Sequence, residues 1–123
     1  MGDLSANFSR KEFACKCGCG FDDVSLELVA LLQKLREHYD KPIVINSACR
    51  CEEHNERVGG AVKREGSTGS KHMYGIAADI VVRGVSPKEV HKHLVGLYPD
   101  KYGVGRYNTF THIDVRPTLA RWG

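Results

Sequence analysis

Residues 70–79 read SKHMYGIAAD, and this stretch indicates more about the fold and chemistry of the chain than any other. It places His72 and Asp79 seven positions apart, and a second histidine, His112, follows in the sequence THIDV at residues 111–115. Two imidazoles and one carboxylate are a common ligand set for a catalytic zinc ion that keeps one coordination position open. If the three side chains converge in the fold, we expect the chain to be a zinc hydrolase.

The downstream histidine segment is expected to be a strand. Residues two apart on a strand face the same side, so His112 and Asp114 should point together while Ile113 and Val115 enter the core. His112 can then bind the metal. Asp114 can either orient His112 or accept a proton from a metal-bound water, and the sequence leaves both roles open.

Hydrolysis needs a proton acceptor and a cation besides the metal. A zinc ion lowers the pKa of its water from about 16 to about 7 and polarises a carbonyl oxygen. Asp114 is the candidate base, and Arg50 is the candidate cation because a guanidinium binds carboxylates through two parallel hydrogen bonds. Each residue also has an ordinary interpretation, as a hydrogen-bond partner or a surface ion pair. We expect only such roles for the other histidines, which are His38, His54, His91 and His93.

Hydrophobic spacing and turn residues predict an α+β fold in one domain, residues 1–123. Leucines at positions 28, 31, 32 and 35 mark the buried face of a long helix, and a second helix begins at Ser86-Pro87. A capping box at residues 9–12 indicates a short helix near the start. Strands are expected at residues 43–46, 77–82, 102–107 and 111–115. Together these elements form a small, mostly antiparallel sheet packed with two main helices.

Composition limits the partners of the chain. A net charge of +3 over 123 residues is too small to indicate nucleic-acid binding. No run approaches the roughly 18 apolar residues that a membrane span needs, and the first residues lack the apolar stretch of an export signal. We therefore expect no nucleic acid partner, no stable membrane association and a monomer.

Five cysteines are many for this length. They fall into two groups, Cys15, Cys17 and Cys19 in the first, and Cys49 and Cys51 in the second. An odd count without an export signal argues against a full disulfide framework. The favoured interpretation is small buried thiols with at most one disulfide. The alternative is a second, structural metal site that draws on both groups, although Cys-x-Cys-x-Cys is not the usual zinc spacing.

Three motifs resemble those of one family. Residues 70–79 resemble the Ser-x-His-x-x-Gly-x-Ala-x-Asp motif of the zinc D-alanyl-D-alanine carboxypeptidase family, peptidase family M15. THIDVR at residues 111–116 resembles its downstream histidine segment, and NSACRC at residues 46–51 resembles its arginine-bearing segment. Residues 7–15 look like the start of its short, single-domain members. The resemblance covers nearly the full chain in the right order.

The resemblance implies one catalytic zinc ion held by His72, Asp79 and His112, with Ser70 and Arg50 contacting substrate or stabilising the oxyanion. It implies the α+β fold shared with the Hedgehog signalling domain. It also implies hydrolysis of peptidoglycan stem or cross-bridge peptides, by a D,D-carboxypeptidase or an endopeptidase, for cell-wall degradation or remodelling. A phage-type enzyme released from the cytoplasm at lysis and an enzyme acting at the cell wall fit the resemblance equally well.

One position departs from the family pattern. Many members carry a catalytic acid three residues before the second metal histidine, where this chain has Thr109. Asp114 is expected to take over as base. The alternative is a non-catalytic, zinc-stabilised binding module of the same fold. The choice between carboxypeptidase and endopeptidase is expected to depend on the loop at residues 62–69.

Overall fold

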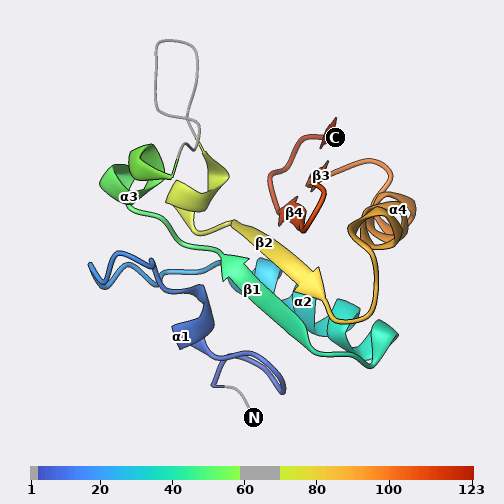
Figure 1. Cartoon of the computed structure of the whole chain (residues 1–123), viewed down its shortest axis with the longest axis horizontal. Coiled ribbons are helices and arrows are strands. Elements are labelled where there is room, and N and C mark those ends of the chain that lie inside the picture. Colours follow the sequence, from blue (N-terminus) through green and yellow to red (C-terminus); the bar gives the residue numbers. More distant parts are fainter. Residues whose placement is uncertain (1–2, 59–69) are drawn as a thin grey trace.

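Five strands form one sheet in the computed structural model, which describes residues 3–58 and 70–123 (Figure 1). The strands are β1 (Ile43–Ser47), β2 (Ala77–Val82), β3 (Gly103–Arg106), β4 (Thr111–Asp114) and β5 (Ala120–Trp122). They lie in the order β1-β2-β4-β3-β5. Neighbours are antiparallel except β3 and β5, which pair in parallel. β2 and β4 therefore have a partner strand on both sides.

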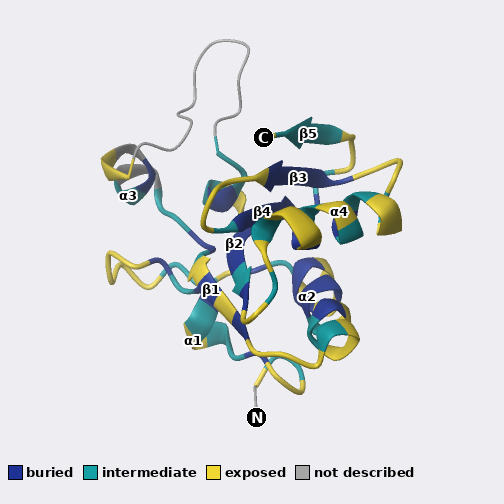
Figure 2. Ribbon diagram, turned by 45° about the vertical axis from the view of Figure 1, so that its right-hand side comes forward, coloured by how far each residue is buried: buried dark blue, intermediate teal, exposed yellow. Residues whose placement is uncertain are grey.

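The helices of the described residues pack mainly on one face of this sheet. They are α1 (Arg10–Phe13), α2 (Leu26–Tyr39), α3 (Glu52–Arg57), the 3-10 helix η1 (Lys71–Tyr74) and α4 (Pro87–Leu97). α2 and α4 lie next to each other (Figure 2). The rings of His38 on α2 and His93 on α4 stack at a centroid distance of 4.0 Å. Val90 and Leu94 of α4 join α2 in the same core.

A serine caps each of the two main helices, and α4 begins at Ser86-Pro87 as expected from the sequence. The Ser25 side chain accepts a hydrogen bond from the Leu28 N–H at 3.4 Å, which satisfies a free donor of the first turn of α2. The Ser86 side chain does the same for Glu89 in α4, where Pro87 occupies the first helical position. The leucines predicted to form one face of α2 are buried, namely Leu28, Leu31, Leu32 and Leu35.

The two faces of the sheet have different compositions. Ala78, Ile80 and Val82 of β2 belong to the hydrophobic core, as does Ile113 of β4. Because strand residues alternate, Asp79 faces the opposite side, where His112 is its direct cross-strand partner on β4. α2 and α4 thus cover one face, and the polar residues of β2 and β4 lie on the other.

The structure confirms the α+β class with a mostly antiparallel sheet and two main helices. Its strands differ from the expected ranges by one residue at several ends. β5 was not expected, because three residues between a turn and the C-terminal glycine carry no strand pattern. The expected irregular stretch at residues 59–69, with the loop at 62–69, lies outside the described residues. No helix in the described part of the chain has the length and apolar character that crossing a membrane requires.

Candidate metal centre

Two imidazoles and one carboxylate meet on the open face of the sheet, as the sequence predicted. His72 comes from η1, Asp79 from β2 and His112 from β4. Oδ1 of Asp79 lies 3.3 Å from Nε2 of His72 and 3.0 Å from Nδ1 of His112. All three side chains are buried, and one possible ligand atom of each lies within 4.8 Å of the others.

The local backbone explains how His72 reaches Asp79. Ser70 caps η1, and its Oγ accepts the His72 backbone N–H at 3.2 Å. Gly75 ends the helix in the left-handed region with φ of 69°. A Cβ at Gly75 would lie 2.2 Å from the carbonyl oxygen of Asp23, so both the dihedral angle and the space require glycine. This short turn directs the chain from His72 into β2.

Outer hydrogen bonds fix which nitrogen of each ring faces the centre. Nδ1 of His72 lies 2.7 Å from the backbone oxygen of Ala48, which can only accept, so Nδ1 donates and the lone pair of a neutral ring is on Nε2. Nε2 of His112 similarly donates to Oδ2 of Asp114 at 2.7 Å. In neutral rings with these tautomers, the lone pairs of His72 and His112 face the Asp79 carboxylate, and without a metal ion a ring N–H that donates to Asp79 takes the same position.

Three electron-pair donors that face one another repel unless a cation lies between them. In a tetrahedral zinc site with bonds near 2.0–2.1 Å, neighbouring ligand atoms are about 3.3 Å apart. The measured separations of 3.3 and 3.0 Å are close to that value. Backbone carbonyls and carboxylates behind the imidazoles are the usual second layer of such sites. His72, Asp79 and His112 therefore fit a zinc ion.

The charges of the centre also suit a cation. Burial alone would raise the pKa of Asp79, but hydrogen bonds with His112 and His72 outweigh it and hold this pKa well below its usual range. Asp79 is therefore ionised throughout the physiological range. An ionised carboxylate and two neutral imidazoles are the ligand forms that zinc requires.

Asp114, the candidate base, lies behind His112. It is fully buried and accepts two hydrogen bonds from the Arg116 guanidinium, each 2.7 Å long, and one from the backbone N–H of Gly103 at 3.1 Å. Burial acts to raise the pKa of Asp114, but the bonds with His112 and Arg116 outweigh it and lower this pKa strongly. This geometry favours the orienting role over proton transfer.

Arg50, the candidate cation, lies beside the centre. Its guanidinium donates to Oδ2 of Asp79 at 3.2 Å, to Ser47 at 3.1 Å and to Asn55 at 3.3 Å. Burial lowers the pKa of Arg50, while the charge of Asp79 acts in the opposite direction. Among the described residues these partners use three of the five guanidinium N–H groups, and the other two can serve a ligand.

Two further residues singled out in the sequence analysis are Ser70 and Thr109, and only Ser70 lies near the metal centre. Ser70 is half-buried and two residues from His72, so its hydroxyl lies near the centre. Thr109 is exposed in the turn between β3 and β4. It does not replace the acid of the family pattern.

The sequence analysis did not identify three residues of the site, which are Arg116, Trp122 and Gly103. Arg116 was part of the quoted segment THIDVR, and its spacing of two from Asp114 was the available signal. Trp122 of β5 lies with its ring centroid 5.0 Å from that of His112. Gly103 of β3 leaves room for the Asp114 carboxylate, because a Cβ there would lie 2.4 Å from Oδ2. The last two depend on strand register, which no local pattern announces.

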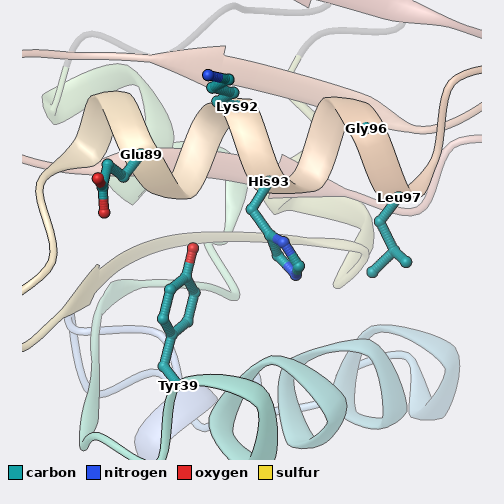
Figure 3. Close-up of a pocket in the computed structure, with 6 residues that line it drawn as sticks. All are labelled: Tyr39, Glu89, Lys92, His93, Gly96 and Leu97. Atoms are coloured by element: carbon teal, nitrogen blue, oxygen red, sulfur yellow. The ribbon is translucent and has the colours of Figure 1, made fainter.

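Two pockets differ in their relation to the centre. One adjoins η1 and the end of β4 and is lined by Lys71, Tyr74, Ile76, Arg116, Pro117 and Thr118. The other lies between α2 and α4, on the helix-covered face, and is lined by Tyr39, Glu89, Lys92, His93, Gly96 and Leu97 (Figure 3). Only the first lies beside residues that build the metal centre.

Comparison with known proteins identifies the family. Residues 6–114 match the family model described as Peptidase M15, a range that includes Arg50, Ser70 and the three candidate ligands. No curated protein matches the chain. The family match confirms the resemblance read from the sequence motifs, and membership implies a peptidase activity that in this family generally depends on zinc. The chain belongs to the Peptidase M15 family.

Proposed function

We propose that the protein is a zinc metallopeptidase that hydrolyses peptidoglycan stem or cross-bridge peptides, as a D,D-carboxypeptidase or an endopeptidase. One observation carries the proposal: His72, Asp79 and His112 converge with metal-ligand spacing in a chain of this peptidase family. Zinc bound there would polarise a carbonyl group and lower the pKa of a water molecule. The side chains around the centre bind and orient the substrate.

The charge around the centre supports an acidic peptide as substrate. Lys71 and Arg116 line the pocket that adjoins η1, and Arg50 donates to Asp79 in the metal centre. Peptidoglycan peptides carry several carboxylates, and cations near a cleft attract such ligands and raise their rate of association. Tyr74 and Ile76 in the same pocket supply apolar contact for a small side chain such as that of alanine.

Each residue beside the ligands has a distinct role in the proposed reaction. The two unused N–H groups of Arg50 stabilise negative charge on the carbonyl oxygen as it develops. The Ser70 hydroxyl, which accepts from His72, donates its own hydrogen to the substrate. Asp114 holds the His112 ring in one orientation, and Arg116 holds Asp114.

A non-catalytic, zinc-stabilised binding module is the second candidate. The contacts of the two carboxylates at the described centre favour this function. Asp79 faces the other candidate ligands and Arg50, and Asp114 is hydrogen-bonded to His112 and Arg116, so neither is placed as a general base. Thr109 offers no carboxylate at the usual acid position. Incubation of the zinc-loaded chain with defined muropeptides separates the two functions: a peptidase releases products of lower mass, and a binding module returns the muropeptides intact.

His72→Ala tests the proposed function. We expect the variant to lose the zinc ion of this centre and with it at least a hundredfold of the muropeptide cleavage rate, because one of three protein ligands is missing. Zinc content measured by elemental analysis and product masses give the two readouts. The same masses show whether a terminal or an internal bond is cut.

His38→Ala is the matched control. His38 is exposed on α2 and stacks on His93, away from the centre. The His38→Ala variant should retain the zinc ion and cleave muropeptides at the wild-type rate. Cleavage by His72→Ala at the wild-type rate, or an unchanged zinc content in that variant, would contradict the proposal.

A further inference from the structure

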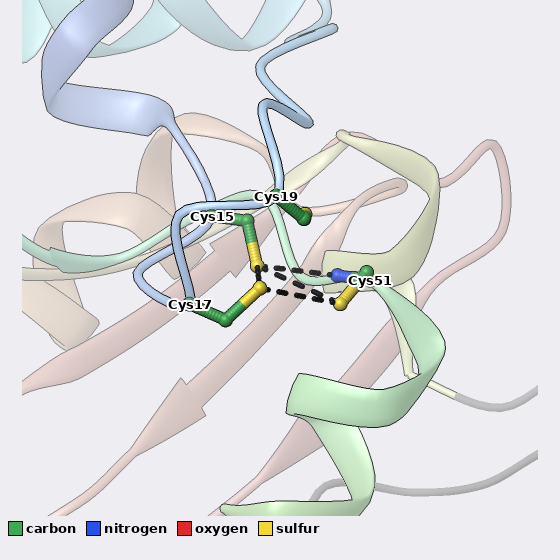
Figure 4. Close-up of side chains that lie close together, drawn as sticks. All are labelled: Cys15, Cys17, Cys19 and Cys51. Atoms are coloured by element: carbon green, nitrogen blue, oxygen red, sulfur yellow. Dashed lines mark hydrogen bonds between the residues drawn. The ribbon is translucent and has the colours of Figure 1, made fainter.

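Four of the five cysteines gather at a second place in the fold, apart from the peptidase centre. Cys15, Cys17 and Cys19 lie in the segment between α1 and α2, and Cys51 immediately precedes α3 (Figure 4). One sulfur of each lies within 4.8 Å of the others. Cys49 remains separate, buried in the hydrophobic core. This differs from the favoured sequence interpretation of buried thiols, because Cys17 and Cys19 are exposed.

The sulfur separations match a shared metal ion. Sγ of Cys15 lies 3.4 Å from that of Cys17 and 3.9 Å from that of Cys51, and the Cys17 and Cys51 sulfurs are 3.6 Å apart. A disulfide requires about 2.05 Å, so all these cysteines are free thiols. Four sulfurs bonded to one zinc ion at about 2.3 Å stand about 3.8 Å apart at the corners of a tetrahedron.

The backbone explains how an unusual Cys-x-Cys-x-Cys spacing brings three sulfurs together. Gly18 and Gly20 both adopt left-handed dihedral angles, with φ of 82° and 91°. A turn closes from the Gly18 N–H to the Cys15 carbonyl at 3.2 Å. These glycines bend the chain, so the three alternate cysteines come closer together than the roughly 6–7 Å that separates residues two apart on an extended strand.

Two backbone N–H groups donate to the sulfurs. The Cys51 N–H donates to Sγ of Cys15 and the His54 N–H to Sγ of Cys51, each at 3.4 Å. Such bonds stabilise a thiolate, which is the form that binds metal.

We propose that Cys15, Cys17, Cys19 and Cys51 bind a second, structural zinc ion through four thiolates. Thiolates are soft ligands that prefer zinc to magnesium or calcium, and four protein ligands leave no position open for substrate. The site is thus closed, in contrast to the three-ligand centre on the sheet. The proposal is independent of the peptidase function, because it rests on residues that do not contact that centre.

This second ion would fix the segment that carries Arg50. Cys51 follows Arg50 directly, and the Cys49 and Arg50 N–H groups donate to the carbonyls of Phe13 and His72 at 2.9 and 3.0 Å. An ion that joins Cys51 to the segment of Cys15 therefore holds the guanidinium beside Asp79. The structural site would support the geometry of the peptidase centre without contacting substrate.

The zinc content of variants that each lack one of the two metal sites tests the proposal. We expect two zinc ions per wild-type chain, one in C17S/C51S and one in His72→Ala. Cys49→Ala is the matched control, since it removes a cysteine outside the cluster, and it should retain both ions. A wild-type chain that binds one ion, with the same content in C17S/C51S, would overturn the proposal while leaving the peptidase centre intact.

A measurement on the wild-type chain avoids variants that fail to fold. Cobalt(II) exchanged into both sites should give intense thiolate-to-metal absorption in the near ultraviolet, which the histidine and carboxylate ligands cannot produce. Alkylation should leave four cysteines protected until a chelator is added. Absence of the thiolate absorption, or a disulfide between any two of the four cysteines in the freshly purified protein, would refute the site.

Discussion

The Asp114 carboxylate joins a histidine, an arginine and a backbone amide in one buried group. Oδ2 accepts from both His112 and Arg116, and Oδ1 accepts from Gly103. Burial alone would lower the pKa of His112, but its bonds with Asp114 and Asp79 raise it. A carboxylate with all these donors orients a ligand ring and has little remaining affinity for a proton.

Asp114→Asn separates orientation from proton transfer. If Asp114 orients His112, the variant should bind zinc about 10- to 100-fold more weakly. Its kcat should return to within a few-fold of wild type once zinc saturates the centre. The measurements are the zinc dissociation constant and kcat at saturating zinc. A base would give the opposite result, a kcat about 10²- to 10⁴-fold lower with zinc fully bound.

At the residue scale, the ligands could be predicted and their supporting partners could not. His72, Asp79 and His112 lie in two short segments, residues 70–79 and 111–116, and their convergence was expected because these segments resemble the motifs of one family. The contacts of Gly103 and Trp122 depend on how β3, β4 and β5 align, which local sequence does not specify. Ala48, which holds His72 through its carbonyl, has no side-chain signal at all.

At the scale of elements, one hydrogen bond links α2 to the strand region. The Tyr102 hydroxyl, just before β3, donates to the Glu27 carboxylate of α2 at 2.6 Å. This bond, together with burial, raises the pKa of Tyr102 to about 12. The folded state therefore prefers the protonated phenol more strongly than the unfolded chain does.

Tyr102→Phe should lower the free energy of unfolding by about 1 kcal/mol at neutral pH, since one partly exposed hydrogen bond is lost. In the wild type this contribution is fully present below the unfolded pKa of 10 and is lost as the pH rises through about 12. Urea unfolding at pH 8 and at several values above 10 measures both effects. Tyr98→Phe, whose ring lies 4.9 Å from that of Tyr102, is the control. An equal loss in both variants at pH 8 would contradict the assignment.

Helix starts were the most predictable elements, because caps are local. Ser25 and Ser86 cap α2 and α4 through bonds within three residues, and the sequence analysis placed the start of the second of these helices at Ser86-Pro87. β5 depends entirely on a distant strand, since it pairs with β3 across a separation of seventeen positions at Gly103 and Ala120. Its three residues have no stability as a strand outside the sheet.

At the scale of the whole molecule, bound metal should contribute to stability. An ion that binds only the folded chain stabilises it by about 2.7 kcal/mol when its free concentration is 100 times the dissociation constant. A chelator should therefore lower the Tm of the wild-type protein, and added zinc should restore it. Added magnesium should not restore the Tm. Thermal unfolding followed by circular dichroism measures this, and an unchanged Tm in the presence of chelator would contradict metal binding at both sites.

The candidate ligands of the metal centre lie on two kinds of element, two on the sheet and one on a short helical turn. This difference implies a route by which a metal ion enters and leaves. Asp79 and His112 are cross-strand partners on strands with neighbours on both sides, so they separate only if the sheet opens. His72 belongs to a single 3-10 turn outside the sheet, which is held by hydrogen bonds with Ala48, Ser70 and Arg50 and ended by Gly75. Short helical turns open far more often than central strands. Release and uptake of the ion should therefore proceed by a swing of His72, at a rate set by this turn and not by global unfolding.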